Sequence, residues 1–230
     1  MLPIRDSIRS RSFPVINVGI IVACVGVFFA QVQAGAAAQE WAFRPDMLVP
    51  SRGPGFGEAL TALFLSMFMH GGVMHLGGNM LFLWVFGDNI EDRMGHGKYL
   101  VFYLICGVLA TIAHSLFALT TGMADVALVG ASGAIAGVLG AYFVLFKHAR
   151  IRTLIFLFFI ITTVDLPAGF FLIYWLVIQV LSIGAGPVAY FAHIGGFAAG
   201  YLLVRVFTDT SKPRPPEEPK PPRVTNLRIE

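Results

Sequence analysis

The chain has 230 residues, of which 57% are hydrophobic and 13% are charged, with a formal net charge of +3. Soluble domains carry roughly 25% charged residues, so this composition excludes an ordinary soluble protein. The many large apolar residues also exclude disorder over most of the chain. The composition indicates a membrane protein, and the apolar residues suffice for about six helices of about 20 residues each. The positive charge is therefore expected to orient the chain in a lipid bilayer, and it does not indicate nucleic-acid binding.

Apolar segments recur along the chain at lengths that fit transmembrane helices. Residues 1–12 contain three arginines and are expected to form a cytosolic N-terminus. Residues 36–70 are rich in glycine and proline and are expected to form a long structured loop on the outer side. A polar turn is predicted at residues 87–97. The predicted spans are, in chain order, residues 13–34, 72–86, 98–119, 128–146, 168–183 and 187–207.

The most ambiguous part of the chain is the apolar stretch at residues 153–183, which is too short for two full spans. We interpret residues 154–163 as an interfacial or re-entrant stretch that precedes the fifth span. Residues 208–230 contain six prolines and mixed charges, which predicts a disordered cytosolic tail. The predicted fold is thus an all-α membrane protein, with a six-transmembrane-helix domain at residues 13–207.

The basic residues support this arrangement. With the N-terminus inside and six spans, every lysine and arginine falls on the inner side except Arg44 and Arg52. Cytoplasmic loops carry such an excess of positive charge. The sequence therefore predicts a multi-pass integral membrane protein with both termini in the cytoplasm.

Polar side chains inside the predicted spans are costly and usually functional, and four of them are candidates for a common site. His75 and Asn79 are one helical turn apart in the second span, Ser132 lies in the fourth and His193 in the sixth. At 1.5 Å per residue, all four fall roughly 5 to 10 Å below the outer surface.

Glycine pairs in two of these spans indicate that the spans touch. Gly133 and Gly137 in the fourth span, and Gly196 and Gly200 in the sixth, have the GxxxG spacing that allows helix backbones to approach closely. If these faces meet, Ser132 and His193 are neighbours.

A hydroxyl beside an imidazole can act as a nucleophile and general base. His75, Asn79 and backbone N–H groups near the start of the fourth span could then stabilise an oxyanion. Each residue alone also has a structural interpretation, since serine often bonds to its own helix and asparagine often links helices. His70, at the edge of the outer loop, is a further polar candidate for a structural or functional role.

Three short segments together resemble the rhomboid family of intramembrane serine proteases. They are HGGVMHLGGN at residues 70–79, GASG at 130–133 and AHIGGFAAG at 192–200. The resemblance implies a six-helix rhomboid-like bundle and a catalytic dyad of Ser132 and His193. It further implies that Asn79, His75 and the Ser132 backbone N–H stabilise the oxyanion.

The same resemblance implies that Gly130 and Gly133 shape the turn around the nucleophile. The implied substrates are single-span membrane proteins, cut near the outer membrane surface, and no cofactor or metal is required. A substrate is expected to pass the fifth span and the loop at residues 184–186 and to unwind locally before cleavage. The compact core looks like a prokaryotic form, which suggests the cytoplasmic membrane. The natural substrate and the oligomeric state stay open.

The sequence departs from the rhomboid pattern at two places. Some members carry a Trp-Arg pair in the first outer loop, where this chain has Thr61 and Ala62. Some carry a tyrosine one turn after the nucleophile, where this chain has Ala136. Both the anchoring of the outer loop and the support of His193 must therefore differ here.

Other functions remain as alternatives. A metalloprotease could use His70, His75 and His193, but no His-Glu-x-x-His motif and no glutamate within a span accompany them. An aspartyl protease needs two intramembrane aspartates, and Asp165 is the only candidate. A transporter would show inverted repeats and broken helices. In a non-catalytic scaffold, Ser132 and His193 would be dispensable.

Overall fold

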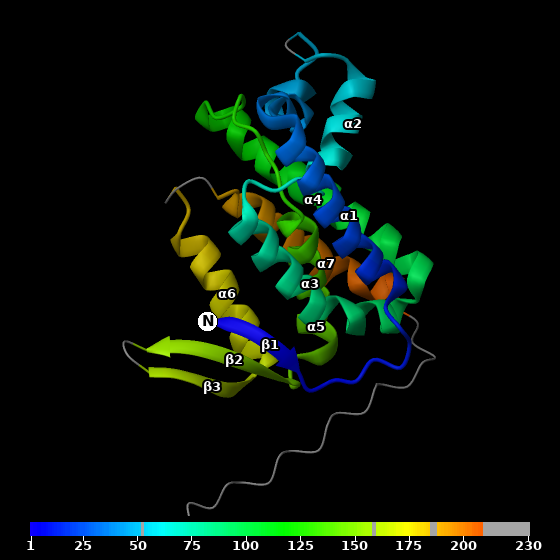
Figure 1. The fold of residues 1–230 in the computed structure, drawn as a ribbon, viewed down its shortest axis with the longest axis vertical. Helices are drawn as coiled ribbons and strands as arrows, with labels where there is room; N and C mark the ends of the chain where they lie inside the picture. The colour runs from blue at the N-terminus through cyan, green and yellow to red at the C-terminus, as the bar shows by residue number, and fades with distance from the viewer. Residues whose placement is uncertain (52, 158–159, 185–187, 209–230) are drawn as a thin grey trace, which may run out of the picture.

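A computed structural model describes residues 1–51, 53–157, 160–184 and 188–208. The protein is mostly helical, with a small antiparallel sheet at one end (Figure 1). The helices are α1 (Val15–Ala34), α2 (Phe56–Ser66), α3 (Val73–Met94), α4 (His96–Thr121), α5 (Ser132–Phe146), α6 (Ala168–Leu181) and α7 (Tyr190–Phe207). Two 3-10 turns, η1 (Gly35–Trp41) and η2 (Pro45–Leu48), precede α2. The strands are β1 (Leu2–Asp6), β2 (Arg150–Leu157) and β3 (Ile160–Pro167).

Helix α5 forms the centre of the bundle, and every residue from Gly133 to Tyr142 is buried. It packs directly on α7 through glycines, as predicted. A Cβ atom on Gly196 would collide with the Gly133 carbonyl, and one on Gly200 would collide with the Gly137 carbonyl. This contact requires the small residues, because any side chain would push the two backbones apart.

A polar turn was predicted at residues 87–97. Helix α3 instead continues to Met94, and the prediction is therefore wrong for residues 87–94. The buried carboxylate of Glu91 accepts hydrogen bonds from the backbone N–H groups of Ile16 (2.9 Å) and Asn17 (2.8 Å). The first N–H groups of a helix have no partner within it and favour a negative charge. Glu91 therefore caps α1, and its helical position in α3 is what allows this.

A second carboxylate holds the segment that leads into α1. Asp92 Oδ1 accepts hydrogen bonds from the backbone N–H groups of Arg11 and Ser12, both at 3.2 Å, and from Ser12 Oγ at 2.9 Å. Asn17 links the same region to its neighbours, because its amide donates to the Leu83 carbonyl (3.0 Å) and accepts from the Tyr99 hydroxyl (2.8 Å). The charged end of α3 thus joins α1 to the bundle.

The all-α prediction is wrong for one region, because residues 154–157 and 160–163 lie in the antiparallel strands β2 and β3 and not in a re-entrant stretch. Strand β2 pairs with both β1 and β3. Arg152 and Asp165 form a bidentate ion pair across β2 and β3, at 2.9 and 3.1 Å. Alternating β-branched residues at Ile151, Thr153 and Ile155 favour a strand in this position.

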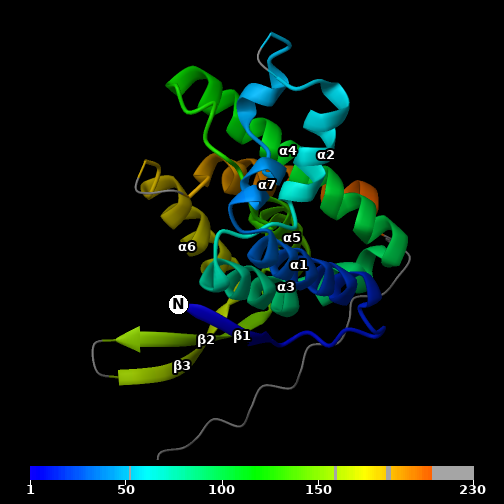
Figure 2. The same cartoon turned by 45° about the horizontal axis from the view of Figure 1, so that its top comes forward.

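The N-terminal residues take part in the same sheet. Strand β1 pairs with β2 from Leu2↔Leu154 to Asp6↔Ile151, so residues 1–12 are more than a separate cytosolic extension. Asp6 is anchored to the helices by hydrogen bonds from Asn89 Nδ2 (2.6 Å) and from the Tyr142 hydroxyl. In both views the sheet and α2 lie at opposite ends of the bundle (Figures 1 and 2).

Three segments of the described chain are long and apolar enough to cross a membrane: Val15–Trp41, His96–Thr121 and Tyr190–Phe207. Helices α5 and α6 are apolar but have only 15 and 14 residues, and α3 ends in a charged turn. The length and apolar character of these helices therefore indicate a membrane protein. The count of six spans stays a prediction. The predicted tail lies outside the described residues beyond Thr208, as do residues 185 and 186 of the loop after α6.

Candidate active site

The contact between α5 and α7 brings Ser132 and His193 together. Ser132 is the first residue of α5, and His193 lies in the first turn of α7. The Ser132 Oγ and His193 Nε2 atoms are 2.8 Å apart, which is hydrogen-bond distance. A Cβ atom on Gly133 would approach the Ala110 Cβ to 2.7 Å, so this glycine also allows α4 to pack against the start of α5. The pair can act as a nucleophile and its base.

Helix α6 supports the opposite side of the His193 ring. The Nδ1 atom of His193 lies 2.6 Å from Gln179 Oε1. The Trp175 ring lies beside the imidazole, with centroids 5.8 Å apart and planes inclined by 37°. The alanine at position 136 predicted that another residue supports His193, and Gln179 and Trp175 provide that support. The sequence contained a signal for this contact, because Gln179 is the only amide or charged side chain in α6. It lies one turn after Trp175, so the two side chains share a helix face.

The His75 ring faces the turn that precedes Ser132. The Gly71 N–H donates to His75 Nδ1 at 3.3 Å, so in the neutral ring the proton is on Nε2. A Cβ atom on Gly130 would lie 2.9 Å from His75 Cε1 and 3.0 Å from Nε2. Gly130 also has φ +132°, which disfavours other residues. Gly130 therefore gives His75 access to the Ser132 side of the turn.

Asn79 lies one turn after His75 on α3 and is buried. Its Nδ2 has no hydrogen-bond partner among the described residues. Buried polar atoms in proteins are almost always paired, so such an atom calls for an explanation. An amide donor that is ready to bind a transient negative charge is one such explanation.

His70 has a structural position beside this group. Its ring packs edge-on against His75, with centroids 5.3 Å apart, and its Nδ1–H donates to the Phe68 carbonyl at 3.1 Å. Its backbone is held by Gln31 of α1, which accepts from the His70 N–H (2.9 Å) and donates to the His70 carbonyl (3.3 Å). Burial, with a further effect from His75, lowers the pKa of His70 to about 4. His70 is thus neutral near pH 7. The side chain of Gln31 anchors the end of the loop segment that was expected to need an anchor other than a Trp-Arg pair.

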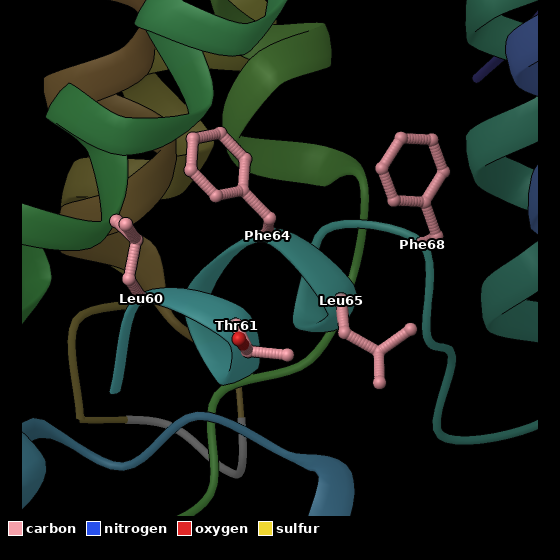
Figure 3. Close-up of a pocket in the computed structure, with 5 residues that line it drawn as sticks. All are labelled: Leu60, Thr61, Phe64, Leu65 and Phe68. Atoms are coloured by element: carbon pink, nitrogen blue, oxygen red, sulfur yellow. The ribbon is translucent and has the colours of Figure 1, made fainter. Parts of the chain in front are cut away.

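A small cavity of about 20 Å³ adjoins Ser132, which is enough for one water molecule. Its polar lining includes Ser66, Thr111 and Ser132. A second hollow of about 510 Å³ lies on α2 and the residues just after it (Figure 3), and its lining is almost entirely apolar. The larger hollow includes no titratable residue and none of the predicted site residues. The smaller cavity is the one that belongs to the candidate site.

The residues of the competing interpretations are not assembled into sites. In the part of the chain that the structure describes, no three His, Cys, Asp or Glu side chains are grouped so that they could hold a metal ion. His193 instead contacts Ser132 and Gln179. Asp165 is paired with Arg152 in the sheet.

Comparisons with known proteins place these features in a family context. A family model described as Rhomboid domain matches residues 57–209. RHOMBOID-like protein 7 of Arabidopsis thaliana is 35% identical over 144 residues, covering 61% of this chain and 41% of the relative. Rhomboid protein 1, mitochondrial, of Saccharomyces cerevisiae is 36% identical over 146 residues, covering 60% and 39%. Rhomboid protease GluP of Bacillus subtilis is 30% identical over 143 residues, covering 61% and 24%.

The matched region spans less than half the length of each of these relatives. They come from a plant, a yeast and a bacterium, so they do not support the expectation of a prokaryotic protein in particular. They do agree with a membrane protein whose matched region contains both Ser132 and His193.

Proposed function

The chain belongs to the rhomboid family, and from this premise we propose that it is an intramembrane serine endopeptidase. Its substrates are single-span membrane proteins, which it cuts near the outer membrane surface. The observation that carries the proposal is the 2.8 Å contact between Ser132 Oγ and His193 Nε2 inside an apolar helical bundle. A polar pair of this kind is costly in such surroundings and calls for a functional reason.

The proposed reaction begins when His193 Nε2 takes the proton of Ser132 Oγ, which attacks the scissile carbonyl. His193 then gives this proton to the leaving amine, and an acyl-enzyme remains on Ser132. Water hydrolyses the acyl-enzyme with His193 acting again as the base. The cavity beside Ser132 has the volume for one such water.

Three donors are proposed to stabilise the negative charge that develops on the carbonyl oxygen. They are the His75 Nε2–H, the Asn79 amide and the backbone N–H of Ser132 at the start of α5. The first N–H groups of a helix lack intrahelical acceptors and carry partial positive charge. Preorganised donors of this type stabilise the oxyanion of the transition state. The position of the His75 ring beside Gly130, two residues before Ser132, supports this assignment.

The position of the dyad supports cleavage near the outer surface. Ser132 lies at the α2 end of α5, since the neighbouring Gly130 N–H donates to the Ser66 carbonyl at 2.9 Å. The opposite end of α5 leads to Lys147 and Arg150, on the side where basic residues gather. A substrate helix must unwind here, because its own hydrogen bonds shield its peptide bonds. Small or helix-breaking residues near the cleavage site should therefore be favoured.

The test uses the purified protein in liposomes with a single-span substrate that carries a helix-breaking residue near its outer end. We expect cleavage in the presence of a chelator, and its loss in Ser132→Ala and in His193→Ala. Ser115→Ala is a control, because Ser115 is a buried serine whose hydroxyl donates to the Thr111 carbonyl of its own helix and makes no hydrogen bond to a histidine among the described residues. Normal cleavage by Ser132→Ala would contradict the proposal and favour a non-catalytic scaffold.

A further inference from the structure

We infer that Gln179 is a positioning residue for His193, and that it selects the imidazole tautomer in which Nε2 can act as the base. This inference rests on the proposed function. Gln179 is buried on α6, whereas Ser132 and His193 lie on α5 and α7. Three separate helices therefore contribute to one hydrogen-bonded chain.

The orientation of the Gln179 amide is set by the backbone of its own helix. Gln179 Nε2 lies 3.2 Å from the Trp175 carbonyl oxygen, one turn earlier. A carbonyl oxygen only accepts hydrogen bonds, so the group that faces it must be the amide NH₂. The Oε1 atom is therefore the one that faces His193, and a flipped amide would place two acceptors against each other.

This orientation determines the proton position on the imidazole. Since Oε1 only accepts, the atom at 2.6 Å, His193 Nδ1, must carry the proton. In a neutral imidazole the other nitrogen is then an acceptor. That atom is Nε2, which lies 2.8 Å from the Ser132 hydroxyl. The backbone carbonyl of Trp175 thus determines, through one amide, that His193 is ready to accept the serine proton.

A glutamine suits this position in an apolar bundle. In soluble serine hydrolases of the triad type, a buried carboxylate holds the histidine and stabilises the imidazolium. Burying a carboxylate is expensive when it is not fully paired, whereas a neutral amide avoids most of that cost. Compared with a carboxylate, Gln179 makes the same orienting hydrogen bond to His193 but carries no negative charge.

The Trp175 ring adds a second constraint from the same helix face. It lies beside the imidazole, and its own carbonyl is the group that orients Gln179. Other residues of α6 lie on an exposed face, including Ile173 and Val177. Substitutions on the two faces of α6 should therefore have different effects on His193.

The experiment compares Gln179→Leu and Gln179→Glu with wild type and with Val177→Ala, an exposed-face control on the same helix. Cleavage of a single-span substrate is measured as kcat and KM over a range of pH, and His193 is followed by ¹⁵N NMR. Gln179→Leu should lower kcat at least tenfold with little change in KM, because it removes the acceptor for Nδ1–H. Its NMR spectrum should show loss of the Nδ1–H tautomer, whereas Val177→Ala should leave the Nδ1–H tautomer of His193 unchanged.

Gln179→Glu is the conservative variant, and it also decides the question if Gln179→Leu does not fold. Its carboxylate still accepts from Nδ1–H, so the tautomer should persist. The acidic limb of the kcat profile should move up by about one pH unit, because a neighbouring negative charge favours imidazolium. An unchanged acidic limb in this variant, or unchanged kcat and tautomer in Gln179→Leu, would overturn the inference. Cleavage by Ser132→Ala would instead refute the proposed function, and the tautomer measurement does not depend on that outcome.

Discussion

Buried polar groups at the two ends of the bundle differ in which of them have hydrogen-bond partners. At the end near the sheet, Glu91 and Asp92 are saturated by backbone N–H groups of the segment that begins α1. At the α2 end, Asn79 Nδ2 and His70 Nε2 have no partner within the described residues. Unpaired buried polar atoms cost stability, and paired ones contribute to it. The difference separates a region that holds the helices together from the region that contains the proposed active site.

The largest expected effect comes from removing the base at the α2 end. His193→Ala should reduce cleavage about 10⁴-fold, because Ser132 then has no group to take its proton. The measurement is the rate of substrate cleavage in liposomes. The thermal unfolding midpoint should change little, and a variant that keeps more than a tenth of the wild-type rate would show that His193 is not the base.

Loss of an oxyanion donor should have a smaller effect of the same kind. Asn79→Ala should lower kcat about 10²-fold, because one donor to the developing negative charge is gone. Its stability should not fall, since Nδ2 makes no hydrogen bond to the described residues. Kinetics and thermal unfolding measured on the same preparation check this. Lower stability with a normal rate would make Asn79 a structural link between helices.

The reverse pattern is expected at the other end. Glu91→Ala should lower the free energy of unfolding by about 2 kcal/mol, because the buried N–H groups of Ile16 and Asn17 lose their acceptor. The folded fraction should still react at the wild-type rate. Thermal unfolding in detergent and activity per folded molecule provide the measurements. An unchanged midpoint would show that water replaces the carboxylate without cost.

The smallest effect concerns pH and the anchor of β1. Burial raises the pKa of Asp6 from 3.8 to about 7. Between these values the folded protein holds a proton that the unfolded chain has released, so this group makes stability fall as pH rises from about 4 to 7. Asp6→Asn should flatten that part of the profile of unfolding midpoint against pH. If the profile keeps its slope in the variant, another group is responsible.

Local patterns accounted for the elements that carry the site. The two glycine pairs predicted the contact of α5 with α7, and helical depth placed Ser132 and His193 at one level. The pairing of β1 with β2 was not predictable in the same way, because its partners are separated by more than 140 residues. Nothing local to residues 1–12 or 150–167 specifies that register. The apolar composition of the hairpin concealed its strands, since membrane helices are also rich in isoleucine and leucine.

The polar contacts between helices could not be predicted from local sequence either. Gln179 is a single amide in an apolar helix, and its meaning depends on which helix it faces. Glu91 and Asp92 look like a solvent-exposed turn until α1 is placed against them. In both cases the sequence shows the residue type, but only the tertiary structure shows its partner.

The central claim is that Ser132 is a nucleophile activated by its surroundings, and covalent labelling tests it most directly. Wild-type protein in liposomes is treated with an acylating serine probe, and the modified peptide is identified by mass spectrometry. The account predicts a single adduct on Ser132, no adduct in Ser132→Ala, and strongly slowed labelling in His193→Ala. Absence of labelling in a wild-type protein that is folded, or equal labelling of Ser132→Ala, would contradict it.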